Sequence, residues 1–326
     1  MNWDLLGHEW AVNQLKEQIV QDRLRHAYLF TGPQGIGRRT LALRLAQALN
    51  CLQPTQPGEP CRVCNTCQQV ERMQHPDLAI VQAETRGSAL KVDQIRQLQR
   101  SLSLSPYAAR YRVAVFLHFE EANQNAANAL LKTLEEPPAQ VILVVTAESA
   151  ESLPPTIVSR CEVLRLRSLP LNQVMQWLQT RWGLPPEQAQ LMAHISEGRP
   201  GYALRLHQDP DLLQHRQARL NEFIGLLSAT RVERFAYAEN LARDKDGLRQ
   251  TLFTWLSLWR DVLLRSAGSA APVANLDRAD EIESLAAHVS LEAAHGFVAA
   301  LENTLSLLEG NVNPRLATEV LLLDLP

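Results

Sequence analysis

The first half of the chain alternates unbroken apolar segments with segments of helical periodicity. Four short apolar segments predict buried strands, at residues 27–31, 78–81, 113–117 and 141–145. Before and between them, apolar residues at helical spacing predict helices, at residues 1–25, 39–49, 91–104 and 123–134. Buried strands that alternate with helices are typical of a parallel sheet covered on both faces, so this half predicts an α/β domain.

The second half of the chain carries no strand pattern. Short helices are expected at residues 170–206, and only helices and connectors are expected from residue 211 onward. Asn313 followed by Pro314 predicts the N-cap and the first residue of the last helix. The second half therefore predicts an all-α region.

Composition and charge narrow the class of protein. The 326 residues are 46% hydrophobic, which is enough for packed cores, and a length of ~150 residues per domain suggests two or three domains. The formal net charge of −3 argues against a chain that binds nucleic acid over its whole surface. The longest strand-like apolar run falls far short of the ~18 residues of a membrane span, and the first residues lack a secretory signal. We therefore expect a cytoplasmic protein without membrane contact.

Four of the five cysteines form a cluster, at Cys51, Cys61, Cys64 and Cys67. In a cytoplasmic protein such a cluster is more typical of a metal site than of disulfides. Four thiolates suit tetrahedral zinc, and two-residue spacers let neighbouring cysteines reach one ion. A closed set of four thiolates leaves no position for water, so the expected zinc is structural. The alternative is four thiols without metal on a loop.

A glycine-rich turn follows the first predicted strand and contains Gly32, Gly35 and Gly37. A strand, a glycine turn and a helix in this order are the context of a phosphate-binding loop. In a working loop the last glycine precedes a lysine for the phosphates and a hydroxyl for magnesium. Here Arg38 and Arg39 occupy those positions, and Thr40 comes one residue late, ~100° around the helix. We therefore expect a degenerate loop, and we do not expect this chain to bind ATP and magnesium.

With these motifs in hand, the chain resembles the AAA+ clamp-loader subunits of bacterial DNA polymerase III. Five matching segments lie in order along the chain: HAYLFTGPQGIG at 26–37, the four cysteines, NALLKTLEEPP at 128–138, LPPTIVSRC at 153–161, and NPRLATEVLLLDLP at 313–326. NALLKTLEEPP followed by SRC is the most specific combination. The resemblance implies three domains: a RecA-like AAA+ domain at 1–163 with a zinc module at 51–67, a small helical lid at 164–209, and an all-α collar at 210–326.

The resemblance also assigns a role to Arg160. Ser159, Arg160 and Cys161 match the family's SRC motif, whose arginine reaches across a subunit interface to the ATP of a neighbour. Arginine fingers of this kind raise the rate roughly 10³–10⁵-fold in GTPases. Because Pro154 and Pro155 stiffen the lead-in, we expect Arg160 to be presented at an edge rather than folded back. Outside this motif, Arg160 would be interpreted as a solvated arginine at a strand end.

The ATP-processing positions of the family are missing here. The positions for magnesium and water activation align with Leu117 and His118, and the γ-phosphate sensor aligns with Gly201. Thr146 is compatible with a sensor-type polar residue and equally with an ordinary strand end. These departures predict a subunit that does not hydrolyse ATP.

The resemblance implies a place in a hetero-pentameric loader within the DNA polymerase III holoenzyme. The chain would contact ATPase subunits of the tau/gamma type and a delta-type subunit through its collar. The complex would open the sliding clamp and place it on primer-template DNA.

Two other functions stay open. One is an active tau/gamma-type ATPase. Arg38, Arg39 and Leu117 argue against it, because they occupy the positions for the phosphate-binding lysine, the hydroxyl and the magnesium ligand. The other is a zinc-containing DNA-binding protein, which the net charge and the absence of aromatic residues in the cysteine cluster disfavour. A weak basic face near DNA, or else a solvated surface, is expected for Arg25, Arg96, Arg100, Arg110 and Arg112.

Overall fold

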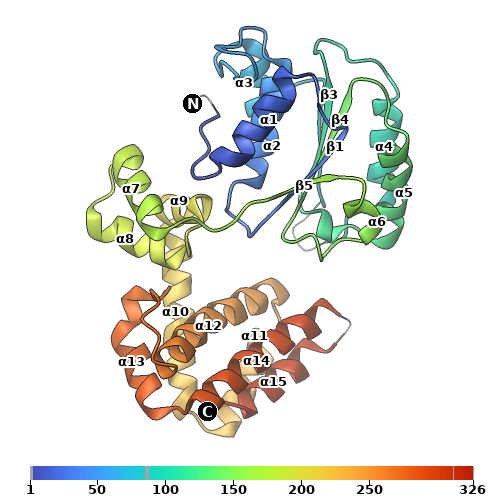
Figure 1. Ribbon diagram of the computed structural model, residues 1–326. Coiled ribbons are helices and arrows are strands. Elements are labelled where there is room, and N and C mark those ends of the chain that lie inside the picture. Colours follow the sequence, from blue (N-terminus) through green and yellow to red (C-terminus); the bar gives the residue numbers. More distant parts are fainter. Residues whose placement is uncertain (1–2, 85–87, 311, 326) are drawn as a thin grey trace. The chain divides into compact units, whose positions relative to one another are not determined.

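The computed structural model describes residues 3–84, 88–310 and 312–325 of the chain (Figure 1). These residues form two compact units. The first comprises residues 1–173 and 199–202, and the second comprises residues 174–198 and 203–326. The finer division into three domains, with boundaries near residues 163 and 209, stays a prediction.

The first unit is built on a five-stranded parallel sheet in the order β2-β3-β4-β1-β5. The strands are β1 (Ala27–Thr31), β2 (Leu78–Val81), β3 (Arg112–Phe116), β4 (Val141–Ala147) and β5 (Glu162–Arg165). The four strands expected from the apolar segments are confirmed, as is the parallel arrangement. The edge strand β5 escaped prediction because its sequence, EVLR, mixes charged and apolar residues and its charged ends are tolerated at a sheet edge.

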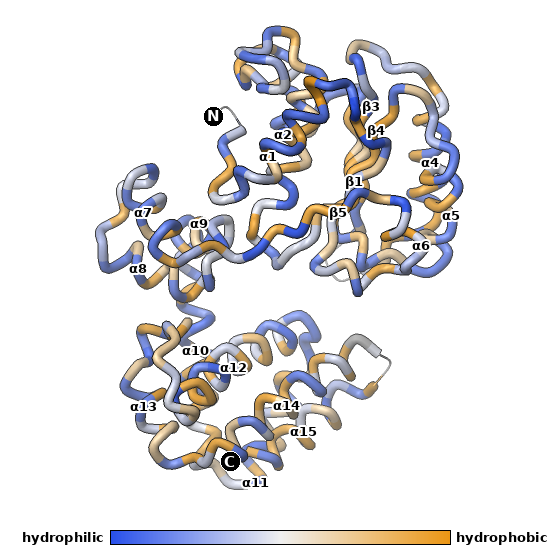
Figure 2. Tube along the Cα trace, viewed as in Figure 1, coloured by the Kyte–Doolittle hydropathy of each residue, from blue (hydrophilic) through white to orange (hydrophobic). Residues whose placement is uncertain are grey.

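Helices cover both faces of the sheet (Figure 1). One face carries α1 (Glu9–Val20), α2 (Arg38–Asn50) and α3 (Asn65–Glu71), and the other carries α4 (Val92–Leu102), α5 (Gln124–Glu135) and α6 (Pro155–Val158). Alternate residues of β1 point to opposite faces, so Tyr28 and Phe30 join one apolar core while Ala27 and Leu29 join the other. The hydrophobic strands lie between the two helical layers in Figure 2. A short 3₁₀ turn, η1 (Phe119–Glu121), follows β3.

The first helix is shorter than the periodicity predicted. It begins at Glu9 because the preceding chain turns twice, with positive φ angles at Asp4 (47°) and Gly7 (75°). Trp3 is buried before these turns, and its indole Nε1–H donates to the carbonyl of Gly58 at 3.0 Å. The first residues therefore anchor the cysteine-rich insertion instead of extending the helix.

Among its described residues, the second unit contains helices and connecting segments and no strand, as expected. Its helices, some of which begin in the first unit, are α7 (Leu171–Trp182), α8 (Pro186–Ile195), α9 (Pro200–Gln208), α10 (Pro210–Ser228), α11 (Arg231–Leu241), α12 (Lys245–Ser266), α13 (Ala279–His288), α14 (Leu291–Glu309) and α15 (Pro314–Leu323), with a 3₁₀ turn η2 (Leu276–Arg278). Its core contains an aromatic cluster of Phe223, Trp255, Trp259 and Phe297.

The predicted start of the last helix is confirmed. The Asn313 side chain caps α15 by accepting the backbone N–H groups of Arg315 and Leu316, and Pro314 is its first residue. Among the described residues, no helix is both long enough and apolar enough to cross a membrane.

Asp77 organises the long connection between α4 and β3. Its buried carboxylate accepts the backbone N–H groups of Tyr107, Ala108 and Ala109 at 2.7 to 2.9 Å, and Arg112 Nη2 at 3.2 Å. Burial alone would raise the pKa of Asp77, but these donors outweigh burial and hold that pKa below its usual value. The charged carboxylate is therefore the form that the fold stabilises.

We expect Asp77→Asn to lower the free energy of unfolding by about 1–3 kcal/mol at pH 7, because an amide cannot accept from all four donors. The advantage of the wild type should be complete above the unfolded carboxyl pKa of ~3.9 and should shrink as the pH falls through the lower, folded pKa. Urea unfolding of both proteins at pH 7 and near pH 3 measures this difference. Equal stability at pH 7 would contradict the anchoring role of Asp77.

Candidate functional site

The glycine turn between β1 and α2 has the local build of a phosphate loop. Gly32, Gly35 and Gly37 have φ angles of 144°, 86° and 114°, a backbone region that favours glycine. A Cβ atom on Gly32 would lie only 2.3 Å from the Leu166 carbonyl oxygen. The turn therefore needs glycine at these positions, and it delivers Arg38 as the first residue of α2. Thr40, one helical step past the usual hydroxyl position, is half-buried.

The tip of this turn contacts the segment Arg199–Tyr202, which belongs to the same compact unit. The backbone N–H of Gly201 donates to the Gly35 carbonyl at 2.8 Å. A Cβ on Gly201 would lie 2.8 Å from that carbonyl oxygen, and a Cβ on Gly35 would lie 2.8 Å from the Tyr202 nitrogen. The segment aligned with the γ-phosphate sensor thus packs on the loop through backbone atoms.

Arg38 is buried next to the turn and faces carboxylates of its own chain. Only 5% of it is exposed, and its Nη1 lies 4.0 Å from Oε1 of Glu120. Burial lowers the pKa of Arg38, while the charges of Glu120 and Glu148 oppose that shift. Arg38 Nη1 and Glu120 Oε2 are buried, and neither has a hydrogen-bond partner in the described part of the chain. The sequence did not predict this pairing, because Glu120 lies on a different element with no motif linking it to Arg38.

The ends of β3 and β4 lie beside this cluster. Leu117 is buried in the core, where an apolar side chain offers no ligand to a metal ion. His118 has a positive φ of 54°, and its backbone N–H donates to Oγ1 of Thr146 at 3.1 Å. Its Nδ1 lies 3.6 Å from Oε1 of Glu120. Thr146, left open by the sequence, therefore joins the two strand ends.

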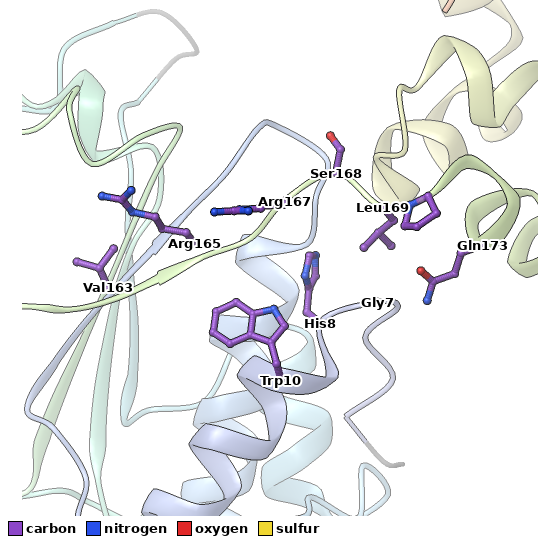
Figure 3. Close-up of a pocket in the computed structure, with 10 residues that line it drawn as sticks. Gly7, His8, Trp10, Val163, Arg165, Arg167, Ser168, Leu169 and Gln173 are labelled. Atoms are coloured by element: carbon purple, nitrogen blue, oxygen red, sulfur yellow. The ribbon is translucent and has the colours of Figure 1, made fainter. Parts of the chain in front are cut away.

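A pocket of about 570 Å³ lies in the same unit and was not predicted (Figure 3). Figure 3 shows the rings of His8 and Trp10 on one side and the side chains of Arg165 and Arg167 on another. His8 is buried, its Nε2 has no partner in the described part of the chain, and burial lowers its pKa. The lining comes from residues at and just before the start of α1, from β5 and from the chain that follows β5, so no local sequence motif predicts it.

Arg160 follows α6 and is turned back onto its own chain. Its Nη1 donates to the Thr156 carbonyl at 2.8 Å, and its Nη2 donates to Oε1 of Glu135 at 2.5 Å. The Ser159 hydroxyl donates to the same Thr156 carbonyl at 3.2 Å. Glu135 thus provides a counter-ion that the sequence did not reveal, and the presentation of Arg160 at an interface edge stays a prediction.

The four clustered cysteines meet as predicted. All four Sγ atoms lie within 4.8 Å of one another, and those of Cys61 and Cys67 are 4.0 Å apart. An ion with metal–sulfur bonds of ~2.3 Å and tetrahedral geometry places its sulfurs ~3.8 Å apart, so the set fits a metal ion.

The thiols of the cluster differ in how readily they ionise. Burial tends to raise the pKa of Cys61, but the N–H groups of Cys64 and Val63, together with the neighbouring thiols, lower it to about 6. Burial raises the pKa of Cys51 and Cys67, so a metal ion that binds all four thiolates would displace protons from those two thiols. The insertion is further tied to the unit by ion pairs from Glu59 to Lys16 and from Arg62 to Asp4.

The weak basic face is largely neutralised by carboxylates. Four of its five arginines form ion pairs, namely Arg25 with Glu162, Arg96 with Asp93, Arg110 with Asp22 and Arg112 with Asp77. A surface paired in this way offers little net charge to a phosphate backbone.

Comparisons with known proteins cover nearly the whole chain. The family model described as "DNA polymerase III, delta subunit" matches residues 7–170, and the one described as "DNA polymerase III, delta subunit, C terminal" matches residues 210–326. The chain is 29% identical over 315 residues to the DNA polymerase III subunit delta' of Bacillus subtilis (strain 168), covering 95% of this chain and 94% of that protein.

Two further relatives match part of the chain. The subunit delta' of Pseudomonas aeruginosa is 35% identical over 186 residues, which is 56% of each protein. The DNA polymerase III subunit tau of Escherichia coli (strain K12) is 33% identical over 208 residues, covering 62% of this chain and 32% of tau.

Proposed function

The chain belongs to the DNA polymerase III delta-subunit family, as a clamp-loader subunit of the delta-prime type, and we propose that it is a non-hydrolysing member of the loader. It donates Arg160 to the ATP site of a neighbouring tau/gamma-type subunit. The helices from residue 210 onward join it to that subunit and to a delta-type subunit. The assembled complex acts in the cytoplasm and loads the sliding clamp onto primed DNA.

The observation that carries the non-hydrolysing role is the buried Arg38 facing Glu120. Phosphoryl transfer needs a cation for the phosphates, a hydroxyl and an acidic residue for magnesium. Here the cation already faces a carboxylate of its own chain, and the side chain at the hydroxyl position is Arg39, which contacts Met73. Buried Leu117 stands at the acidic position. Nothing at these positions provides the metal ligands of a working site.

The position of Arg160 supports an action on a neighbour. In the parallel pair of β1 and β5, Thr31 lies opposite Arg165, so both strands have their C-terminal ends where the glycine turn begins. Arg160 precedes β5 and therefore lies at the N-terminal ends of the strands, ~16 Å away along the strand direction. A finger must touch the phosphate it stabilises, so Arg160 can serve only a nucleotide held by another subunit.

Structural zinc completes the proposal. The four thiols leave no open coordination position, so a bound zinc ion would fold the insertion and take no part in chemistry. The apolar residues Leu52 and Val63 of this insertion are exposed, so they add little to its packing.

The purified protein should contain about one zinc per chain, held by Cys51, Cys61, Cys64 and Cys67. Chelation should expose the insertion to proteases before the rest of the unit, because metal binding and folding of such sites are coupled. Elemental analysis and limited proteolysis measure both effects. Less than half an equivalent of metal, in protein purified without chelator, would count against the zinc site.

The isolated chain should not turn over ATP, and its affinity for magnesium-ATP should be far weaker than that of a tau/gamma-type subunit measured beside it. A coupled ATPase assay and a calorimetric titration give the two quantities. Turnover that disappears in Arg38→Ala would instead identify an active ATPase.

Arg160→Ala should leave assembly intact and should lower the clamp- and DNA-stimulated ATPase of the reconstituted complex. The loss should be partial, because the other ATP sites keep their own residues. Arg160→Lys should restore little, since an ammonium cannot make the planar two-point contact of a guanidinium. Exposed Arg23→Ala serves as a charge-matched control. Equal ATPase rates for wild type and Arg160→Ala at saturating clamp and DNA would contradict the arginine-finger role of Arg160.

A further inference from the structure

The guanidinium of Arg160 is held by its own chain mainly at two points, and its Nη1 also lies 3.4 Å from the Ser159 hydroxyl oxygen. One point is the Thr156 carbonyl in the short helix α6, and the other is the carboxylate of Glu135 at the end of α5. Within the described part of the chain, the Nε–H of Arg160 has no partner. The side chain is thus fixed in orientation while part of its donor edge stays available.

The two holding groups are themselves rigidly placed. Leu130 and Leu134 of α5 pack in the same apolar core as Ile157 of α6. The end of α5 is tied to the start of β1, because the Leu134 carbonyl lies 3.0 Å from Nε2 of His26. Elements that share a core keep a constant separation, so Glu135 and Arg160 can meet without reordering the chain.

An arginine finger depends on this kind of support. The side chain of arginine has many rotamers, and a group that stabilises a transition state acts best when its orientation is set before the reaction. Because Glu135 contacts one terminal nitrogen and leaves Nε–H available, it can set the plane of the guanidinium without occupying all its donors.

We propose that Glu135 is a positioning residue for Arg160, holding its guanidinium in the orientation that meets the phosphate of a neighbouring subunit. This inference rests on the proposed function of Arg160. Glu135 would then contribute by hydrogen bonding, so glutamine, whose carbonyl oxygen can accept the same bond, should largely replace it.

The test is steady-state ATPase of the reconstituted loader with clamp and primed DNA. The complex is assembled with wild-type subunit, Glu135→Ala, Glu135→Gln, Arg160→Ala or the Glu135→Ala/Arg160→Ala double variant. Glu136→Ala is the matched control, because it removes the same charge one residue further along and contacts no part of Arg160 in the structure. Size-exclusion chromatography confirms that each variant assembles.

Glu135→Ala should lower the part of kcat that depends on Arg160 by about two- to fivefold, the range of an exposed ion pair, with KM for ATP unchanged. Glu135→Gln should keep most of the rate, and Glu136→Ala should match wild type. The double variant should be no slower than Arg160→Ala, because the two residues act through one guanidinium.

The outcomes separate this inference from the proposed function. If Arg160→Ala matches wild type, the finger itself is wrong. If Arg160→Ala is slow while Glu135→Ala is unchanged, the finger stands and the positioning role is overturned. A faster Glu135→Ala complex also overturns it, since Glu135 would then be a counter-ion that competes with phosphate.

Discussion

The parallel pairing of β1 between β4 and β5 is the constraint on which the other features depend. The C-terminal ends of parallel strands lie on one side of the sheet, so the glycine turn after β1, Thr146 near the end of β4 and the turn after β3 are brought together there. The segments that precede the strands meet at the opposite, N-terminal ends, where Glu135 and Arg160 form their ion pair. The sheet therefore separates the glycine turn from the guanidinium of Arg160, which lie at opposite ends of its strands.

The charge of Arg38 explains why the degenerate loop keeps its architecture. A buried cation without a partner is strongly destabilising, and Glu120 with Glu148 supplies the compensating negative charge. A nucleotide phosphate would have to compete with these carboxylates for the same guanidinium. The contact of Gly201 with Gly35 adds a backbone hydrogen bond at the tip of the turn. The negative charge that faces Arg38 and the hydrogen bond at the tip of the turn thus both come from the chain itself.

The features that could be predicted from the sequence are those set by local residue patterns. Unbroken apolar segments predicted four strands, cysteine spacing predicted the cluster, and Asn313 before Pro314 predicted a capped helix. The missed features depend on contacts between distant segments. Glu120 lies near Arg38 only because β3 and α2 flank the same sheet edge, and Glu135 reaches Arg160 only because α5 and α6 share a core. The pocket beside His8 has the same origin, and no periodicity encodes it.

The ion pairs Arg38–Glu120 and Arg160–Glu135 differ in burial, and therefore in their effect on the structure. Arg38 is almost wholly enclosed, so losing Glu120 would leave a charge that water cannot reach. Arg160 and Glu135 are 35% and 51% exposed, so their pair is weak, and it leaves the Nε–H of Arg160 available to an anion. A buried pair contributes to the stability of the fold, whereas an exposed pair orients a side chain that stays accessible to other molecules. The proposed action of Arg160 on another subunit requires the second kind of support, and the exposed pair with Glu135 provides it.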